Sequence, residues 1–422
     1  MHSAPVAQRG RFQFRTPPVS DEGSAGRVGE KNFNRRESTM RASEVIELLE
    51  DTGNQTILLE AGKGSGAVIV APGLVGRVMC STFDRKQGLA NAWVNDVAIR
   101  KGRTDPVFNN FGGEERIWFA PEGGQFGLMF GRKESRFDNY CVQPAMSSIE
   151  YQVTGRDASS VRMEANLSLE NNSATQFRIH VDRRVSLLDS CPYCLEVPGT
   201  VECVGFQSEN ILRNVGSEVW TRTTGTVNVW CLGQFLEHPH LSVVIPVRSG
   251  IDPQLHPPTV DEYFKDFCLG GIFPPERRVN LENSVLLKVD GEVRGKVGVK
   301  KERAMGRLGS YDAESGHLVI VDHDFYPELD YPSGYWRQYD NAFDGDALSV
   351  YIDGPERVGG AKGQSYELET MSPGLFLRPG DSFSYRNRTF HIRGDREDIN
   401  LISRRFLKAD LKQIEAFTSS VT

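Results

Sequence analysis

The stretch Gln364–Gly374, QSYELETMSPG, places two glutamates two residues apart in a run that is otherwise typical of a β-strand. Successive side chains of a strand point to opposite faces, so Glu367 and Glu369 are expected on one face and their neighbours on the other. Two carboxylates at this spacing repel each other, and neither belongs in a core unless a partner compensates its charge. The pair therefore indicates either cross-strand ion pairs or a site.

Strand signals dominate the chain around this stretch. Short alternating runs bounded by Gly, Pro, Asn or Asp recur from residues 55–62, QTILLEAG, to residues 382–394, SFSYRNRTFHIRG. Helical spacing is confined to residues 42–53 and to residues 406–417, FLKADLKQIEAF. No repeat of fixed period is present, which argues against a propeller. The pattern predicts an all-β fold of large antiparallel sheets with few short helices.

The N-terminal segment differs in composition from the rest. Residues 1–39 contain three valines, no leucine and no isoleucine, with seven Lys/Arg against four Asp/Glu. Such a segment buries too little apolar surface to order itself, so we expect a disordered leader, with Met40 as an alternative start. It lacks the apolar region of a secretory signal. Residues 40–422 show no linker and are expected to form a single domain.

Charge and cysteine content limit the partners and the compartment. The net charge of −7 and the isoelectric point near 5.7 offer no general attraction to nucleic acid or to an anionic membrane. No run approaches the roughly 20 apolar residues of a membrane span. Seven scattered cysteines, an odd number, fit reduced thiols better than a disulfide framework. We therefore expect a soluble, cytoplasmic protein, as a monomer or homodimer.

One pair of cysteines is close in sequence, in Cys191-Pro-Tyr-Cys194. This spacing is compatible with redox chemistry or with half of a zinc site, and His180 and Cys203 lie nearby in sequence. No second pair follows at zinc spacing. We interpret these residues as ordinary thiols and expect neither a metal nor a cofactor.

Three further clusters lie at residues 109–125, 321–346 and 386–395. Each combines hydrogen-bonding groups with aromatic side chains, as recognition of a sugar requires. Each also has a plain structural interpretation: a Gly-rich hairpin, a solvated loop, or cross-strand ion pairs between arginines and glutamates. In the third cluster, Arg386 and Arg388 share one strand face. The candidate ligand-binding residues from these clusters are Asn110, Gly112, Gly113, Arg116, Trp118, His323, Trp336, Arg388 and His391.

The segment Leu368-Glu369-Thr370 resembles a motif of the galactose mutarotase-like superfamily, which includes the aldose 1-epimerases, and Gly112-Gly113 resembles its sugar-holding Gly-Gly turn. The strings FGGEERIWFAPEGGQF and GDALSVYIDGP look more specifically like an uncharacterised bacterial family within it. The resemblance implies a β-supersandwich and makes Glu369 the general base acting on the O1 hydroxyl of a sugar. The chain departs from the superfamily near residues 226–231, where the histidine that acts as general acid is missing.

The resemblance leads us to expect a carbohydrate-active protein, aldose 1-epimerase-like, that binds a small-molecule or oligosaccharide ligand. The expected catalytic residues are Glu369 and His323, with Glu367 among the groups that bind the substrate. Two alternatives stay open on the same fold: a carbohydrate-binding protein without catalysis, and a polysaccharide lyase or glycoside-processing enzyme.

Overall fold

The computed structural model describes residues 39–60, 66–195, 197, 201–261, 263, 273–355 and 364–421. Residues 1–38, which make up nearly all of the predicted leader, lie outside this range. Antiparallel sheets dominate, and the predicted all-β fold with few short helices is confirmed. Among the described residues, no helix combines the length and the apolar character needed to cross a membrane.

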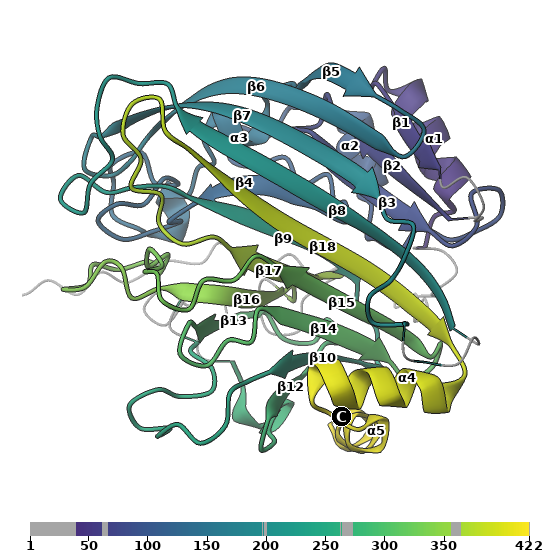
Figure 1. Cartoon of the computed structure of the whole chain (residues 1–422). Helices are drawn as coiled ribbons and strands as arrows, with labels where there is room; N and C mark the ends of the chain where they lie inside the picture. The colour runs from purple at the N-terminus through teal and green to yellow at the C-terminus, as the bar shows by residue number, and fades with distance from the viewer. Residues whose placement is uncertain are drawn as a thin grey trace, which may run out of the picture. The chain divides into compact units, whose positions relative to one another are not determined.

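Ten strands form the largest sheet, and every pairing within it is antiparallel (Figure 1). In spatial order its strands are β11 (Arg278–Asn280), β12 (Ser284–Lys288), β10 (Leu241–Pro246), β14 (Arg307–Asp312), β15 (His317–His323), β18 (Ser382–Gly394), β8 (Val201–Asn214), β7 (Gln176–Leu187), β6 (Ser160–Glu170) and β5 (Gln152–Arg156).

Two smaller antiparallel sheets complete the β-structure. The five-stranded sheet has the order β13 (Gly295–Lys300), β16 (Asp346–Ile352), β17 (Ser365–Met371), β9 (Asn228–Leu236) and β4 (Arg116–Ala120). The three-stranded sheet has the order β1 (Ile57–Glu60), β2 (Ala67–Ala71) and β3 (Arg77–Thr82).

The five-stranded sheet packs on the ten-stranded sheet through one of its faces. The hydroxyl of Thr370 on β17 donates to Asn387 on β18 at 2.8 Å, and Tyr366 hydrogen-bonds to Ser310 on β14 at 2.7 Å. The main hydrophobic core includes the apolar side chains of this layer and extends to the other face of the five-stranded sheet, where Trp118 and Trp230 lie. Because only one face of β7 meets this core, its side chains are buried at every second residue.

Helices lie at the margins of the sheets: α1 (Ala42–Asp51), α2 (Asp96–Lys101), α3 (Pro144–Ser147), α4 (Arg396–Ile402) and α5 (Leu411–Ser420), with short 3-10 or π turns η2 (Phe137–Asn139), η3 (Pro275–Arg277) and η4 (Ser403–Leu407). Near the C-terminus, α4, η4 and α5 cover the other face of the ten-stranded sheet, where a second apolar cluster lies (Figure 1).

The prediction of one continuous helix across residues 406–417 is wrong, because the helical conformation is interrupted within this range. The chain leaves the helical conformation at Lys408, which has φ of 60°, and a new helix starts at Asp410. The Asp410 carboxylate accepts from the amide of Lys412 at 2.9 Å, and the amide of Asp410 donates to the side-chain oxygen of Gln413. This capping box stabilises a new helix start, which the apolar spacing alone did not reveal.

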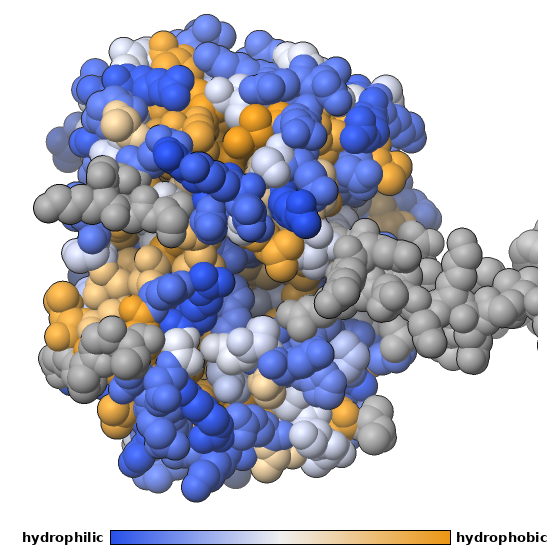
Figure 2. Space-filling view, turned by 90° about the vertical axis from the view of Figure 1, so that its right-hand side faces the viewer, coloured by the Kyte–Doolittle hydropathy of each residue, from blue (hydrophilic) through white to orange (hydrophobic). Residues whose placement is uncertain are grey.

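The exposed surface is mostly polar. Figure 2 shows one face on which hydrophilic residues predominate and hydrophobic residues lie in separate areas between them. The most exposed large apolar side chains in the described ranges are Leu195, Leu255 and Val97, at 74%, 74% and 70%. Scattered residues of this kind are ordinary for a folded chain.

A buried ion pair ties the two large sheets together. Arg183 on β7 donates to Glu115, just before β4, at 2.7 Å, and both side chains are at most 1% exposed. Arg183 also donates to Asn210 at 2.7 Å and to the carbonyl of Gly76 at 2.9 Å, while Asn387 donates to the second oxygen of Glu115 at 2.6 Å. Each charge is thus compensated and hydrogen-bonded, as burial requires.

Substitution Arg183→Met should lower the free energy of unfolding by about 3–5 kcal/mol, because it leaves the Glu115 carboxylate buried without its cation. Chemical denaturation at neutral pH measures the loss. The matched control is Arg162→Met on β6, whose partner Asp182 forms an exposed pair that water screens, so its effect should be far smaller. Equal losses in the two variants would contradict a structural role of the buried pair.

Candidate active site on the five-stranded sheet

The two glutamates of the opening stretch lie on the face of β17 that points away from the ten-stranded sheet. Thr370 contacts β18, so Glu367 and Glu369, one residue out of phase with it, point to the opposite side. In the backbone register Glu369 pairs with Ser349 on β16 and with Leu232 on β9. This face of the sheet carries the candidate site.

Three donors converge on one oxygen of Glu369. Trp230 Nε1 donates to Oε2 at 2.9 Å, Ser349 Oγ at 2.5 Å, and the ammonium of Lys296 lies 3.0 Å away. The glutamate side chain is fully buried. Its other oxygen, Oε1, is buried too, and no group in the described part of the chain hydrogen-bonds to it. Glu369 is therefore held as a carboxylate with one acceptor atom left over.

Lys296 is a buried cation on β13. Its ammonium lies 4.3 Å from the ring centre of Trp230 and 4.7 Å from that of Tyr263. Burial opposes its charge, but the carboxylates of Glu369 and Glu122 outweigh burial, so the pKa of Lys296 is raised. The lysine therefore stays charged beside the Glu369 carboxyl group.

A third carboxyl group, that of Glu122, reaches the same lysine from the loop after β4. Its Oε2 lies 3.8 Å from Lys296 Nζ. Burial raises the pKa of Glu122, the neighbouring Glu369 adds to the rise, and Lys296 and hydrogen bonds with Trp336 and Tyr140 only partly oppose it. Two carboxyl groups therefore face one ammonium, and burial favours the protonated form of Glu122.

Glu367 pairs with Arg116 on β4. Arg116 Nη2 donates to Glu367 Oε1 at 2.9 Å, and both side chains are less than 10% exposed. Burial raises the pKa of Glu367 to about 7, with Arg116 opposing the rise and Glu369 adding to it. The guanidinium lies 4.4 Å from the ring centre of Trp118, and its Nε and Nη1 have no hydrogen-bond partner within the described ranges. These donors, like Glu369 Oε1, are buried polar atoms without a hydrogen-bond partner in the described ranges.

Two loops cover this face: the first, residues 121–151, follows β4, and the second, residues 324–345, joins β15 to β16. Gly123 and Gly334 join them through a backbone hydrogen bond of 3.1 Å, and the rings of Tyr140 and Trp336 stack with centroids 5.6 Å apart. Trp118 Nε1 donates to the carbonyl of Met146 at 3.0 Å, which fixes the indole beneath the first loop. The loops therefore bring aromatic faces and the Glu122 carboxyl over the sheet.

The predicted Gly-Gly turn lies at the same end of the sheet as Glu367. The carbonyl of Gly113 accepts from the amide of Gln234 at 2.9 Å, and Gln234 pairs with Glu367 in the register. Gly113 has φ of 104°, and a Cβ there would lie 2.8 Å from Arg77 Cδ, so the position requires glycine. Asn110, just before the turn, has a buried side-chain oxygen without a partner in the described part of the chain.

Three predicted residues lie elsewhere, which corrects their expected grouping with Glu369. His323 hydrogen-bonds to Tyr385 at 2.9 Å in the layer between the sheets, and burial lowers its pKa to about 3. His391 hydrogen-bonds to Glu114 at 2.7 Å in the same layer. Arg388, on the opposite face of β18, binds aspartates of the same sheet. Alternation sends these side chains to layers that Glu369 does not share.

Sequence reasoning missed several residues that contact Glu369 or lie beside it. For Lys296 a signal was present, since Lys296 and Gly298 alternate with the core residues Val297 and Val299 along β13. No local sequence pattern identified the other missed residues, because their contacts join strands and loops that are distant in sequence. Besides Lys296, the missed residues are Glu122, Tyr140, Trp230 and Ser349.

Comparison with known proteins gives a family without an assigned activity and a set of distant structural likenesses. Residues 42–418 match DUF6786, a family of unknown function. No curated protein matches the chain.

Among solved structures, the chain is similar to a proposed aldose 1-epimerase from Escherichia coli K12, with 12% identity, a TM-score of 0.49 and coverage of 81% of this chain and 99% of the other. It is also similar to the Slr1438 protein of Synechocystis sp. PCC 6803, with 13% identity, a TM-score of 0.48 and coverage of 81% and 96%. A galactose mutarotase-like protein from Lactobacillus casei shows 12% identity, a TM-score of 0.45 and coverage of 80% and 100%.

The stability of the protein should fall as the pH rises through the range in which Glu367 titrates. Its pKa is raised from 4.5 to about 7 on folding, so the folded state binds more protons than the unfolded state between these values. One such group lowers the free energy of unfolding by at most about 1.4 kcal/mol for each pH unit. Substitution Glu367→Gln removes this contribution and should flatten the decline. Denaturant unfolding of both proteins from pH 4.5 to 8 measures it.

The control for this experiment is Glu47→Gln, which changes an exposed carboxyl on α1. Its pH dependence should follow that of the wild type. A Glu367→Gln profile as steep as that of the wild type would show that Glu367 has no raised pKa.

Proposed function

We propose that this chain, which belongs to the family of unknown function DUF6786, is a carbohydrate-active enzyme of the aldose 1-epimerase type with Glu369 as its general base. The observation that carries the proposal is the free Oε1 of Glu369, a buried acceptor on a carboxylate that Lys296, Trp230 and Ser349 hold in place. The resemblance of Leu368-Glu369-Thr370 to the superfamily motif gives the same residue the same role.

The base acts through the atom that the protein leaves unbonded. All three donors lie on Oε2, so Oε1 is the oxygen that can accept a hydroxyl proton. A base must be within hydrogen-bond reach of the proton it takes and must be ionised when the substrate arrives. Lys296 meets the second condition by stabilising the carboxylate. The first condition follows if the anomeric hydroxyl of a sugar occupies the position next to Oε1.

Glu122 is the acid in this proposal. Its raised pKa favours the protonated form, and it faces the same ammonium as Glu369. In ring opening, Glu369 takes the proton of the anomeric hydroxyl, the bond between the anomeric carbon and the ring oxygen breaks, and Glu122 protonates the ring oxygen. After rotation about the adjacent carbon–carbon bond, the reverse transfers close the ring on the other face and restore both carboxyl groups.

Arg116 and the aromatic residues supply recognition. The free Nε and Nη1 of Arg116 are donors for sugar hydroxyls, and its stacking on Trp118 fixes the plane of the guanidinium. Trp336 and Tyr140, whose rings stack on each other in the covering loops, are the aromatic pair that would contact the C–H face of a pyranose. A sugar bound in this way lies between the five-stranded sheet and the loops.

Carbohydrate binding without catalysis is the second candidate function. The observation that favours it is the ion pair itself, because the Lys296 ammonium, 3.0 Å from Glu369, already engages the carboxylate. In addition, no histidine of the described residues contacts Glu369 to serve as the usual acid.

Substitution Glu369→Gln should reduce the rate of anomer interconversion by about 10²- to 10⁴-fold, the usual contribution of a general base. Polarimetry on a panel of freshly dissolved aldoses measures the rate. The glutamine side chain keeps one hydrogen-bond acceptor, so we expect the variant to fold. Circular dichroism and the melting temperature check this. Glu47→Gln, the exposed control on α1, should retain the wild-type rate.

The same assay separates the two candidates. Full activity of the Glu369→Gln variant would remove this residue from the mechanism. A wild-type protein that interconverts no aldose but melts at a higher temperature with a sugar present would be a binding protein.

Substitution Glu122→Gln should lower the rate by about 10²-fold and abolish the decline in wild-type activity at alkaline pH, because the decline reports loss of the Glu122 proton. The pH profile of the rate for both proteins measures this. Glu367→Gln should keep the alkaline decline, which distinguishes the acid from the other glutamate with a raised pKa. An unchanged profile in Glu122→Gln would assign the acid to another group.

A further inference from the structure

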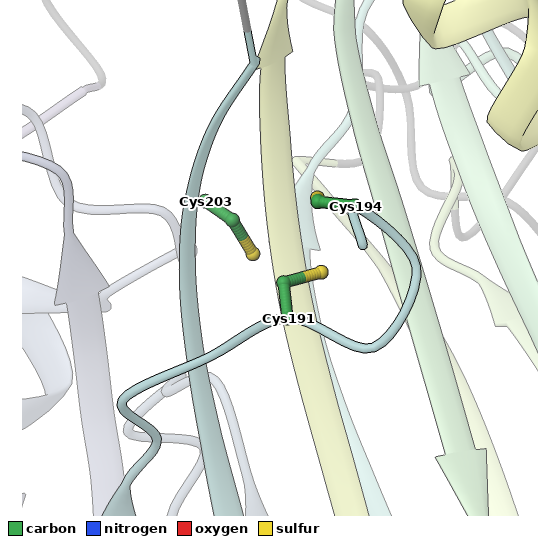
Figure 3. A group of neighbouring side chains, drawn as sticks. All are labelled: Cys191, Cys194 and Cys203. Carbon is green, nitrogen blue, oxygen red and sulfur yellow. The ribbon is translucent and has the colours of Figure 1, made fainter. Parts of the chain in front are cut away.

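Three cysteine side chains meet on the ten-stranded sheet, away from the Glu369 site. Cys191 and Cys194 come from the loop after β7, and Cys203 comes from the start of β8. Their sulfur atoms all lie within 4.8 Å of one another. Figure 3 shows the three side chains pointing toward one shared space between the loop and the strand. The close pair in the sequence thus gains a third thiol from the strand.

The loop that carries the pair is held in a defined conformation. The amide of Cys194 donates to the carbonyl of Cys191 at 3.1 Å, and the amide of Val197 donates to that of Cys194 at 3.2 Å, which makes two successive turns. These two bonds fix the backbone on both sides of Cys194.

Tyr193, between the two cysteines, anchors the loop to the sheet. Its hydroxyl donates to Asp322 on β15, and its ring contacts the edges of Phe390 and Phe406 with centroids 5.2 and 4.7 Å apart. Cys203 pairs with Ile392 in the register of β8 and β18, so the third thiol is fixed by the sheet itself. The three sulfur atoms are therefore positioned by backbone structure.

We propose that Cys191, Cys194 and Cys203 bind one Zn²⁺ or a similar thiophilic divalent cation. A tetrahedral zinc with bonds of about 2.3 Å to sulfur places its ligands about 3.8 Å apart, so a contraction of at most about 1 Å forms the site. A disulfide would use two of the sulfur atoms and leave the third without a role. The Cys-x-x-Cys spacing is that of a structural zinc site, and the described residues supply three of the four ligands that such a site takes.

The cation would act as a structural clamp. Cys191 is buried, while Cys194 and Cys203 are half-buried, which leaves an entry path for the ion. A bound ion connects the loop after β7 to β8, next to the apolar cluster formed with the C-terminal helices. The thiols lose protons when the ion binds, since the thiolate is the ligand. This site is independent of the proposed sugar chemistry.

Titration of the reduced, chelator-treated full-length protein with Co²⁺ tests the proposal. One equivalent should produce the near-ultraviolet charge-transfer absorption of a cobalt thiolate together with visible bands of a tetrahedral ion, and Zn²⁺ should abolish both. Each of Cys194→Ser and Cys203→Ser should weaken binding at least 10-fold. Cys141→Ser, which changes an exposed cysteine elsewhere, should bind like the wild type.

Folding and redox state complete the test. Circular dichroism of the metal-free variants should match that of the wild type, and Zn²⁺ should raise the melting temperature of the wild type and Cys141→Ser only. Absence of the thiolate band in the wild type, or its persistence in both ligand variants, would overturn the proposal. A Cys191–Cys194 disulfide that persists in the presence of Zn²⁺ would overturn it as well and assign the pair to redox chemistry.

Discussion

The alternation of side chains along β17 is the constraint on which the rest of the structure depends. Its residues Tyr366, Leu368 and Thr370 pack toward the ten-stranded sheet, which forces Glu367 and Glu369 to the opposite face. Every neighbouring strand follows the same two-residue period. Charged and aromatic residues on one face of the sheet are therefore a direct consequence of the apolar packing on the other.

Charge balance explains how so many ionisable groups can be buried together. Glu122 and Glu369 lie beside the Lys296 ammonium and Glu367 pairs with Arg116, while the buried carboxyl group of Asp346 accepts from the hydroxyls of Tyr263 and Tyr335. Burial raises the pKa of both Glu122 and Glu367, so these carboxyl groups bind protons more readily than exposed ones, and groups of this kind gather at sites of proton transfer.

Much of the fold could be predicted from the sequence, because strand alternation and turn residues are local signals. The shared face of Glu367 and Glu369 follows from a spacing of two. The layer that a distant strand faces is not a local property, so His323 and His391 could not be assigned to the inter-sheet layer in this way. For the same reason the contact between Glu369 and Lys296 depends on strand order, which spacing does not encode.

The order of strands has a consequence for synthesis of the chain. β17 lies between β16 and β9, and β18 lies between β15 and β8, so an interior strand of each large sheet is synthesised after both of the strands that it pairs with. A nascent or truncated chain that ends before Ser365 leaves an edge unpaired on four strands that are paired on both sides in the folded protein, β8, β9, β15 and β16, and it lacks the proposed base. Open edges of this kind recruit other chains, so the unfinished polypeptide is the form most in need of chaperone protection.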